Sequence, residues 1–190
     1  MGFFLSMKIR IGVMGSADPN PGSELSEAAR ALGQAIAGRG AILLTGATTG
    51  LVYLAGRAAK DAGTLHIGIS PAADQREHVE RYGLPTDACD AMIFTGFGLK
   101  GRNVVLVRSC DVAVFIAGAT GSLNELTIAH DEGKIIGCLA GTGGVADEAE
   151  ELLQKLSSRA PARLFSNKSA DKLLDTCLNA LAAGSTKATG

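Results

Sequence analysis

Residues 112–126 read VAVFIAGATGSLNEL, an apolar run that is followed by glycines and then by a helical pattern. The run predicts a buried strand, and Gly118 and Gly121 allow the backbone to turn sharply and approach a ligand closely. Ser122 is predicted to cap a helix that begins near Leu123. Because the free N–H groups and the dipole of a helix start favour anions, this junction is a candidate phosphate site.

Glu125 is the residue of this stretch that a simple phosphate cradle does not require. In the first turn of the predicted helix its carboxylate would stabilise the helix by roughly 0.3–1 kcal/mol and would repel a phosphate. Alternatively, it faces a sugar hydroxyl or a reacting centre of a bound ligand. The local pattern leaves both interpretations open.

The order of strand, glycine turn and helix recurs along the chain. It predicts an α/β fold, a Rossmann-like doubly wound parallel sheet of about six to seven strands with helices on both faces. The predicted strands span residues 8–14, 41–45, 65–70, 91–95, 111–117 and 134–139. The first predicted helix is capped by Ser23 or Ser26 and runs to residue 38. Further helices are predicted over 51–62, 102–109, 123–132, 146–156 and 170–182. The polar stretch 72–86 is predicted to be a loop or lid.

Length and composition narrow the class of protein. With 190 residues, we expect one nucleotide-binding domain over 8–183, a disordered or extended segment 1–7 and a flexible tail 184–190. Hydrophobic residues make up 46% and aromatic residues only 4%, which predicts a core of small aliphatic side chains. A net charge of -1 provides no basic field for nucleic acid, and no run is long enough to span a membrane.

Cysteines and histidines show no pattern of a metal or disulfide site. The four cysteines are widely spaced without a C-x-x-C pair, which fits free thiols in a reducing cytoplasm. His66 is expected in the core or an interface, and His78 and His130 have no metal-ligand spacing, so no structural metal is expected. NAD binding is disfavoured because no G-x-G-x-x-G opens the first helix and no acid closes the second strand.

Several motifs occur in an order that resembles the lysine decarboxylase-like Rossmann superfamily, over about residues 8–156. These motifs are Gly15-Ser16, Thr45-Gly46 with Gly50, Gly101-Arg102-Asn103 and the GATGSLNE segment. The superfamily contains molybdenum-cofactor carrier proteins and lonely-guy type cytokinin-activating phosphoribohydrolases. The chain looks most like the carrier branch, because Arg102-Asn103 and the stretch 131–144 follow its style.

The resemblance implies a set of ligand-binding residues and two catalytic candidates. The binding set is Gly15, Ser16, Thr45, Gly46, Gly50, Arg102, Asn103, Gly118, Ala119, Thr120, Gly121 and Ser122. Arg102 and Glu125 match the places of an Arg and a Glu that take part in the phosphoribohydrolase reaction.

The chain also departs from the family pattern at a few places. Ala119 replaces the second glycine of the family motif G-G-x-G-T, so either the backbone is conventional there or the ligand approaches less closely. The enzymes carry Arg-Lys and a doubled Glu where this chain has Arg102-Asn103 and Asn124-Glu125. These two substitutions weaken the expectation of catalysis.

Three functions follow as expectations. The first is a cytoplasmic carrier or binding protein for a small phosphorylated ligand, either the molybdenum cofactor (a pterin) or a nucleoside monophosphate. The second is a phosphoribohydrolase acting on nucleoside 5′-monophosphates, with Glu77 or Glu80 as the second acid. The third is a nucleotide-sensing regulatory subunit. A homodimer that pairs the helices 51–62 and 123–130 is also expected.

Overall fold

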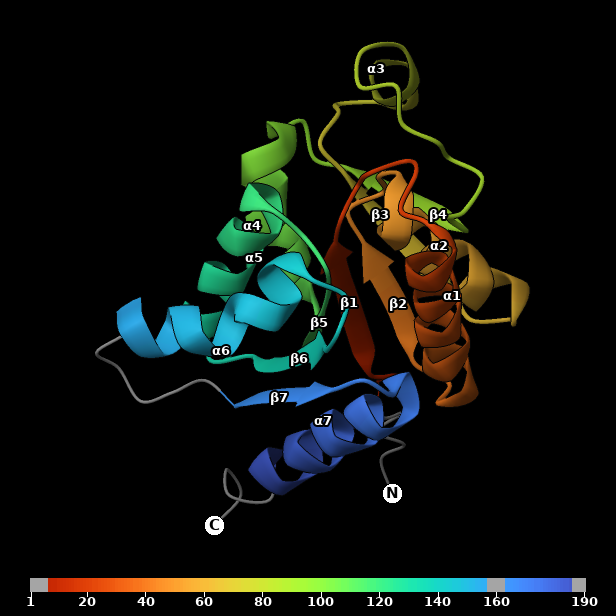
Figure 1. The fold of residues 1–190 in the computed structure, drawn as a ribbon. Coiled ribbons are helices and arrows are strands. Elements are labelled where there is room, and N and C mark those ends of the chain that lie inside the picture. Colours follow the sequence, from red (N-terminus) through yellow and green to blue (C-terminus); the bar gives the residue numbers. More distant parts are fainter. Residues whose placement is uncertain (1–6, 157–162, 186–190) are drawn as a thin grey trace, which may run out of the picture.

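The computed structural model describes residues 7–156 and 163–185, and within them a seven-stranded parallel sheet forms the centre (Figure 1). The sheet order is β4-β3-β2-β1-β5-β6-β7. The strands are β1 (Arg10–Gly15), β2 (Ile42–Thr45), β3 (His66–Ser70), β4 (Ala91–Phe94), β5 (Val112–Ile116), β6 (Ile135–Leu139) and β7 (Leu164–Asn167). The helices are α1 (Ser23–Gly38), α2 (Gly50–Asp61), α3 (Gln75–Glu80), α4 (Gly98–Ser109), α5 (Thr120–Asp131), α6 (Gly144–Leu156) and α7 (Ala170–Ser185).

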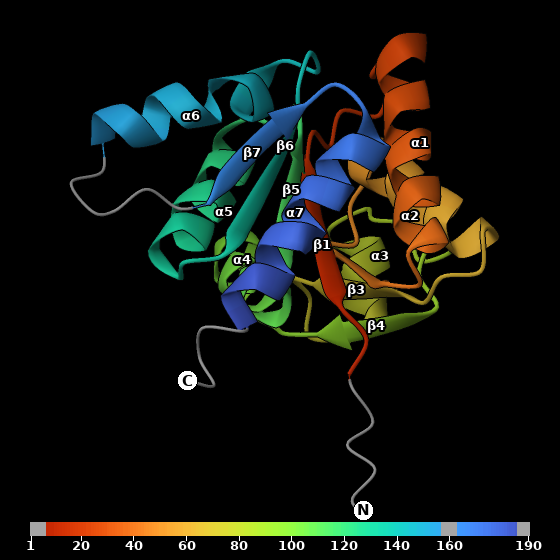
Figure 2. The same cartoon turned by 90° about the horizontal axis from the view of Figure 1, so that it is seen from below.

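Helices cover both faces of the sheet, as the alternating pattern predicts. Helices α1, α2 and α7 pack on one face, and α4, α5 and α6 pack on the other, which Figures 1 and 2 show from two sides. The predicted fold class is therefore confirmed: the protein is a Rossmann-like three-layer α/β structure.

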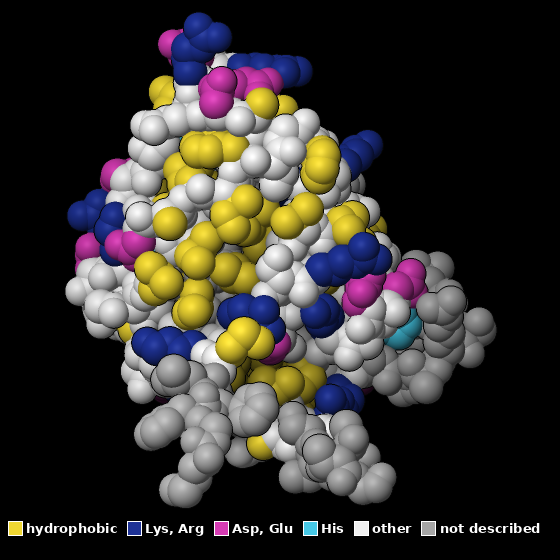
Figure 3. All heavy atoms as spheres, turned by 180° about the vertical axis from the view of Figure 1, so that it is seen from behind, with side chains coloured by type: hydrophobic (Ala, Val, Ile, Leu, Met, Phe, Trp, Pro, Cys, Tyr) yellow, Lys and Arg dark blue, Asp and Glu magenta, His cyan; other side chains and the backbone are white. Residues whose placement is uncertain are grey.

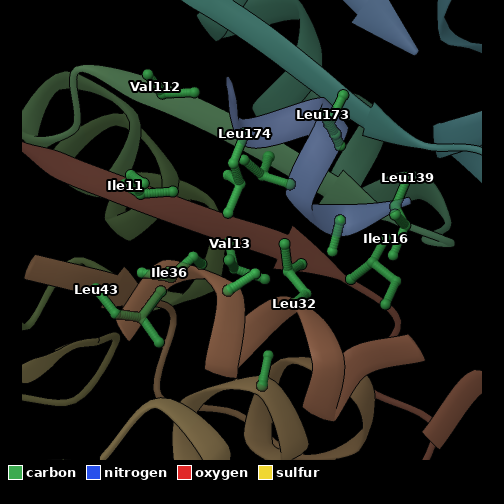
Figure 4. Packing of buried hydrophobic residues seen from close by; sticks show 14 of the residues in the cluster. Ile11, Val13, Leu32, Ile36, Leu43, Val112, Ile116, Leu139, Leu173 and Leu174 are labelled. Carbon is green, nitrogen blue, oxygen red and sulfur yellow. The ribbon is translucent and has the colours of Figure 1, made fainter. Parts of the chain in front are cut away.

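The continuous apolar run of β5 is explained by burial on both faces. Val112, Val114 and Ile116 point to the cluster shared with α1 and α7, part of which Figure 4 shows. Ala113 and Phe115 alternate with them and enter the cluster under α4, α5 and α6. Each large side chain removed from water contributes about 1.5–3 kcal/mol, so a central strand of this kind anchors both layers.

The chain order places a crevice between β1 and β5. From β1 the chain moves outward through β2, β3 and β4, and then returns to β5 on the other side of β1. The connections that leave β1 and β5 therefore run to opposite sides. Open parallel sheets bind ligands at such a switch point, at the carboxyl ends of the strands.

The stretch 72–86, predicted to be a loop or lid, contains a helix that was not predicted. Helix α3 spans Gln75–Glu80, and Asp74 caps it by accepting a hydrogen bond from the Glu77 N–H at 2.8 Å. The Glu77 carboxylate in turn accepts from the Ala73 N–H at 2.7 Å. This reciprocal capping has the acid-x-x-Glu spacing of a helix start, which the local sequence does contain.

Other boundaries differ by a few residues. Helices α4 and α5 begin earlier than expected, at Gly98 and Thr120, and Gly22 rather than a serine is the N-cap of α1. Strand β7 was not predicted, because this short, half-buried edge strand has no continuous apolar run. Helix α7 continues to Ser185, into the predicted tail. The predictions for residues 1–6 and 186–190 lie outside the described residues.

All four cysteines are buried and free, as predicted. Burial raises the pKa of the Cys89 and Cys110 thiols to about 11 and that of Cys138 and Cys177 to about 12. The four thiols therefore stay protonated at neutral pH and act as small core side chains.

Candidate functional site

A pocket of about 920 Å³ opens at the carboxyl ends of β1, β2 and β5, at the switch point of the sheet. Figure 1 shows the carboxyl ends of β1 and β2 as the upper tips of their arrows, on the side of the molecule where α3 lies. Its volume is in the range of small-molecule sites. The lining residues are 13–18, Gly46, Thr48, Thr49, Val52, Tyr82, Leu84, Leu99, Lys100, Arg102, Asn103, 119–122, Asn124 and Glu125.

The turn from β5 into α5 forms one wall. Ala117 and Gly118 both have positive φ values, +49° and +103°. A Cβ atom on Gly118 would lie 2.5 Å from the Ser122 Oγ, so a side chain there would clash. Ala119 has a φ of −125°, which alanine adopts readily, so its replacement of the family's second glycine causes no backbone strain.

The prediction that Ser122 caps α5 is wrong. The helix begins at Thr120, its N-cap is Ala119, and that N-cap makes no side-chain hydrogen bond to the helix. Ser122 is the third helical residue and is buried. Because no side chain caps the helix at Ala119, its first-turn N–H groups are available to an anion in the pocket.

Glu125 lies in the second turn of α5, so the interpretation as a first-turn acid is wrong. The carboxylate is buried, with 9% of the side chain exposed, and it faces into the pocket toward Arg102. Burial raises the pKa of Glu125 to about 7, although the nearby Arg102 guanidinium favours the ionised form. This carboxyl group therefore takes up a proton at a higher pH than an exposed glutamate does.

Arg102 is a buried cation with few partners. Only 7% of its side chain is exposed, and its Nη1 donates a long hydrogen bond of 3.4 Å to the Glu125 Oε1. Its Nε has no hydrogen-bond partner among the described residues. Burial lowers the pKa of the guanidinium, yet arginine stays charged at physiological pH. A guanidinium has five N–H donors, so most of the hydrogen-bonding capacity of Arg102 remains available.

Gly46 creates the space for this guanidinium. A Cβ atom on Gly46 would lie 1.9 Å from the Arg102 Nη1 and 2.5 Å from its Cζ. The glycine after β2 is therefore required by the close approach of a side chain from α4. The sequence placed Gly46 in the binding set, and the structure shows that its role is to admit Arg102.

The two asparagines that depart from the enzyme pattern contact each other. The Asn103 amide lies 2.9 Å from the Asn124 side chain. With its amide turned over, the Asn103 nitrogen lies 3.0 Å from the Glu125 Oε1 and 3.0 Å from the Leu99 carbonyl. The pair thus adds a neutral hydrogen-bond network beside the Arg102–Glu125 ion pair, where the enzymes place charged residues.

The predicted binding set divides into two groups. Most of its members line the pocket: Gly15, Ser16, Gly46, Arg102, Asn103, Ala119, Thr120, Gly121 and Ser122. Thr45, Gly50 and Gly118 are outside the lining and shape the turns behind it. The Thr45 Oγ1, for example, lies 2.8 Å from the buried His66 Nε2 and accepts from the Ala47 N–H at 3.2 Å.

Neither acid proposed for the leaving group reaches the pocket. Glu77 is held by the Ala73 N–H and by Arg81, and it caps α3. Glu80 does not line the pocket either. The second carboxylate in the lining is that of Asp18, in the loop after β1. That loop is polar without a recognisable motif, so the sequence contained no signal for Asp18.

Lys100 and Tyr82 are among the other lining residues that the predicted binding set does not include. Lys100 lies just before the Gly101-Arg102-Asn103 motif on α4 and adds a second cation. Tyr82 comes from the segment after α3, which was assigned to a lid without naming a contact residue. The helical spacing of Lys100 and Asn103 could have indicated that Lys100 lies beside the site. Only tertiary packing reveals the position of Tyr82.

The histidines take structural positions. His66 and His78 are buried, and each bonds a strand-end hydroxyl and a backbone carbonyl. Within residues 7–156 and 163–185, no group of three or more His, Cys, Asp or Glu side chains is placed to hold a metal ion. In the same part of the chain, no helix has the length and apolarity to cross a membrane.

The fold and the pocket define the class: a Rossmann-like α/β protein with a small-molecule pocket at its switch point. The chain belongs to the SLOG cluster4 family, whose model matches residues 8–174. The resemblance to the lysine decarboxylase-like superfamily is thereby confirmed.

Solved structures agree with this assignment. The structural-genomics target TM1055 is 25% identical, with a TM-score of 0.79 over 91% of this chain and 99% of that one. The molybdenum cofactor binding protein of Rippkaea orientalis is 28% identical, with a TM-score of 0.73 over 93% and 99%. The molybdenum cofactor carrier protein of Chlamydomonas reinhardtii gives the same four values.

Proposed function

We propose that the protein binds and carries a small phosphorylated ligand, either a pterin such as the molybdenum cofactor or a nucleoside monophosphate. The observation that carries this proposal is the buried Arg102, whose Nε has no partner among the described residues. A buried donor without a partner costs about 1–3 kcal/mol, and more when the group is charged. A bound anion would remove that cost.

The phosphate is expected between Arg102 and the start of α5. The first-turn N–H groups of the helix and the guanidinium approach the same pocket from two elements, α5 and α4. Together they offer backbone donors and a planar charged fork, the combination that recognises phosphate. Lys100, at the rim, adds charge that favours association.

The remaining lining suits the organic part of the ligand. Leu84 and Leu99 supply apolar surface. Glu125 and Asn103 offer polar contacts for a sugar or a ring edge. Two structural neighbours are named for the molybdenum cofactor, which supports a pterin. In this proposal the cofactor is cargo, and the protein contributes phosphate recognition and a shielded pocket.

The test is binding with and without the phosphate. Calorimetry of wild type and Arg102→Ala with AMP and with adenosine should show roughly a 10- to 100-fold loss for AMP and a much smaller loss for adenosine. Equal losses for both ligands would argue against a phosphate clamp. Mass spectrometry of the ligand that co-purifies with the protein would identify the natural occupant.

A phosphoribohydrolase is the second candidate, because two carboxylates line the pocket, Glu125 and Asp18. The Glu125 carboxylate would stabilise positive charge on the ribose, Asp18 would protonate the departing base, and water would attack the anomeric carbon. The products would be free base and ribose 5-phosphate. Wild type that binds AMP tightly but releases no base from any nucleoside monophosphate would exclude this function.

We still expect a homodimer, but the two helices predicted to pair across it, α2 and α5, are packed inside the protomer. The apolar faces of α2 and α5 are buried inside the protomer, through Leu51, Ala55 and Leu126 among others. Exposed apolar side chains gather instead on β4 and the start of α4, on the face that Figure 3 shows. Ile93 is 50% exposed, and Phe97 is 68% exposed. A second copy is proposed to cover this surface.

A further inference from the structure

A second cleft, of about 670 Å³, lies next to the pocket between α1 and α2. Two positions one turn apart on α1, Ser26 and Arg30, form one side. Tyr53 and Leu54 form the other side, one turn into α2. The cleft is lined by Pro19, Pro21, Ser26, Arg30, Thr49, Gly50, Tyr53, Leu54, Val79, Gly83, Leu84 and Pro85.

The cleft adjoins the pocket. Thr49 and Leu84 line both. The loop after β1 also serves both, because Asp18 lines the pocket and Pro19 lines the cleft. A ligand seated in the pocket therefore lies within one layer of side chains of the cleft.

The chemistry of the cleft suits a flat ring. Prolines and the Tyr53 ring present rigid apolar surface, on which planar heterocycles stack. The Tyr53 hydroxyl donates to the Asp87 Oδ2 at 2.9 Å, and the Arg57 Nη1 donates to the same oxygen at 3.1 Å. These bonds hold the tyrosine in one orientation, so little side-chain freedom is lost when a ring stacks on it.

The wall opposite the helices is also held in place. His78 Nδ1 lies 2.8 Å from the Ser70 Oγ, and His78 Nε2 lies 3.2 Å from the Pro85 carbonyl. A carbonyl can only accept, so the His78 Nε2–H donates to Pro85, while the Ser70 Oγ that bonds Nδ1 also accepts from the Ala72 N–H at 3.1 Å. This buried bridge ties the segment that carries Leu84 to the end of β3.

Arg30 gives the cleft a charge. It is exposed and forms no ion pair with the residues that the structure describes. A cation of this kind beside an apolar cleft complements a ring that is attached through a phosphate.

We propose that the cleft binds the second ring of a dinucleotide-type ligand, in which a pyrophosphate joins the group in the pocket to another planar heterocycle. This rests on the proposed function, because the first phosphate is placed by Arg102 and α5. The pocket would hold one half, the pyrophosphate would pass Thr49 and Leu84, and the second ring would stack on Tyr53 with Arg30 near its phosphate.

The test compares AMP with its pyrophosphate-linked dimer, di(adenosine-5′) pyrophosphate, by calorimetry. Stacking of one base is worth about 1–3 kcal/mol, so wild type should bind the dimer about 5- to 150-fold more tightly than AMP. Tyr53→Ala and Arg30→Ala should each reduce this affinity ratio toward one. Tyr53→Phe should keep most of the ratio, because the ring is retained.

Arg108→Ala is the matched control, because this exposed arginine at the far end of α4 lines neither the pocket nor the cleft. Circular dichroism shows whether Tyr53→Ala is folded, and Arg30→Ala tests the proposal independently, since that side chain is exposed. Equal affinity for AMP and the dimer, with AMP binding still lost in Arg102→Ala, would overturn the second site and leave the first. Failure of wild type to bind either nucleotide would overturn both for nucleotide ligands.

Discussion

Gly46→Ala should weaken phosphate binding without unfolding the protein. The new Cβ would lie 1.9 Å from the Arg102 Nη1, a separation that no real contact permits, so the guanidinium must move. Gly46 does not have a positive φ, so alanine fits its backbone. The atom that yields is the end of a long side chain, and the loss of stability should stay near the low end of the roughly 1–3 kcal/mol typical of overpacking.

Gly46→Ala should lower the affinity for AMP strongly, even though it lowers the stability of the fold only slightly. A hydrogen bond to a charged group contributes about 1.5–3 kcal/mol, so displacing Arg102 from the phosphate should weaken AMP binding roughly 10- to 150-fold. Calorimetry with AMP and adenosine measures the effect, and urea unfolding measures the stability. Adenosine, which has no phosphate, should lose far less affinity.

Gly38→Ala is the matched control for this substitution. Gly38 ends α1, an added Cβ would meet nothing within 4 Å, and the residue does not line the pocket. It should leave AMP binding at the wild-type level. If Gly46→Ala binds AMP as tightly as Gly38→Ala does, the guanidinium is not the phosphate clamp, and the reasoning about Arg102 is refuted.

Three further predictions concern the same pocket and the surface. Gly121→Val should place a branched side chain in the pocket and weaken AMP binding with the fold retained, because an added Cβ meets nothing within 4 Å; unchanged affinity by calorimetry would contradict the site. Glu125 has a pKa of about 7 in the folded protein against an ordinary value of 4.5, so the folded state binds more protons between these values. Stability from this group is fully present below pH 4.5 and is lost as pH rises through 7, on the order of 3 kcal/mol, and Glu125→Gln should flatten that decline in urea titrations at several pH values; parallel profiles would refute it. Light scattering should report a dimer that Phe97→Glu converts to a monomer, and a monomeric wild type would remove the expected interface.

The asparagine pair suggests how a carrier and an enzyme can share one pocket. Asn103 and Asn124 stand where the enzymes have a lysine and an acid, and the structure places them in contact. Replacing both members of a pair by amides keeps a hydrogen bond while it removes two charges from the reaction centre. The double variant Asn103→Lys with Asn124→Glu restores both charges. It therefore allows a direct comparison between a pocket with the charges of the enzymes and the neutral pair of this protein.

The sequence alone determined the alternation of strands and helices and the edge of the sheet at which the pocket lies. Both depend on short-range information: runs of apolar residues, helical periodicity and the glycines that follow strands. The starts of α4 and α5 were misplaced, because a helix that begins without a capping side chain leaves no local signal. Strand β7 was missed because its place at the edge of the sheet leaves it half-buried, without a continuous apolar run.

Tertiary structure alone decided the chemistry of the site. Arg102 and Glu125 are 23 residues apart and come from different helices. Gly46, which follows β2, leaves the space that the Arg102 guanidinium occupies. The raised pKa of Glu125 and the open donors of Arg102 result from burial, which no local pattern encodes. The cleft beside Tyr53 likewise exists only because α1, α2 and the segment after α3 converge, since its lining is drawn from parts of the chain that meet only in the folded state.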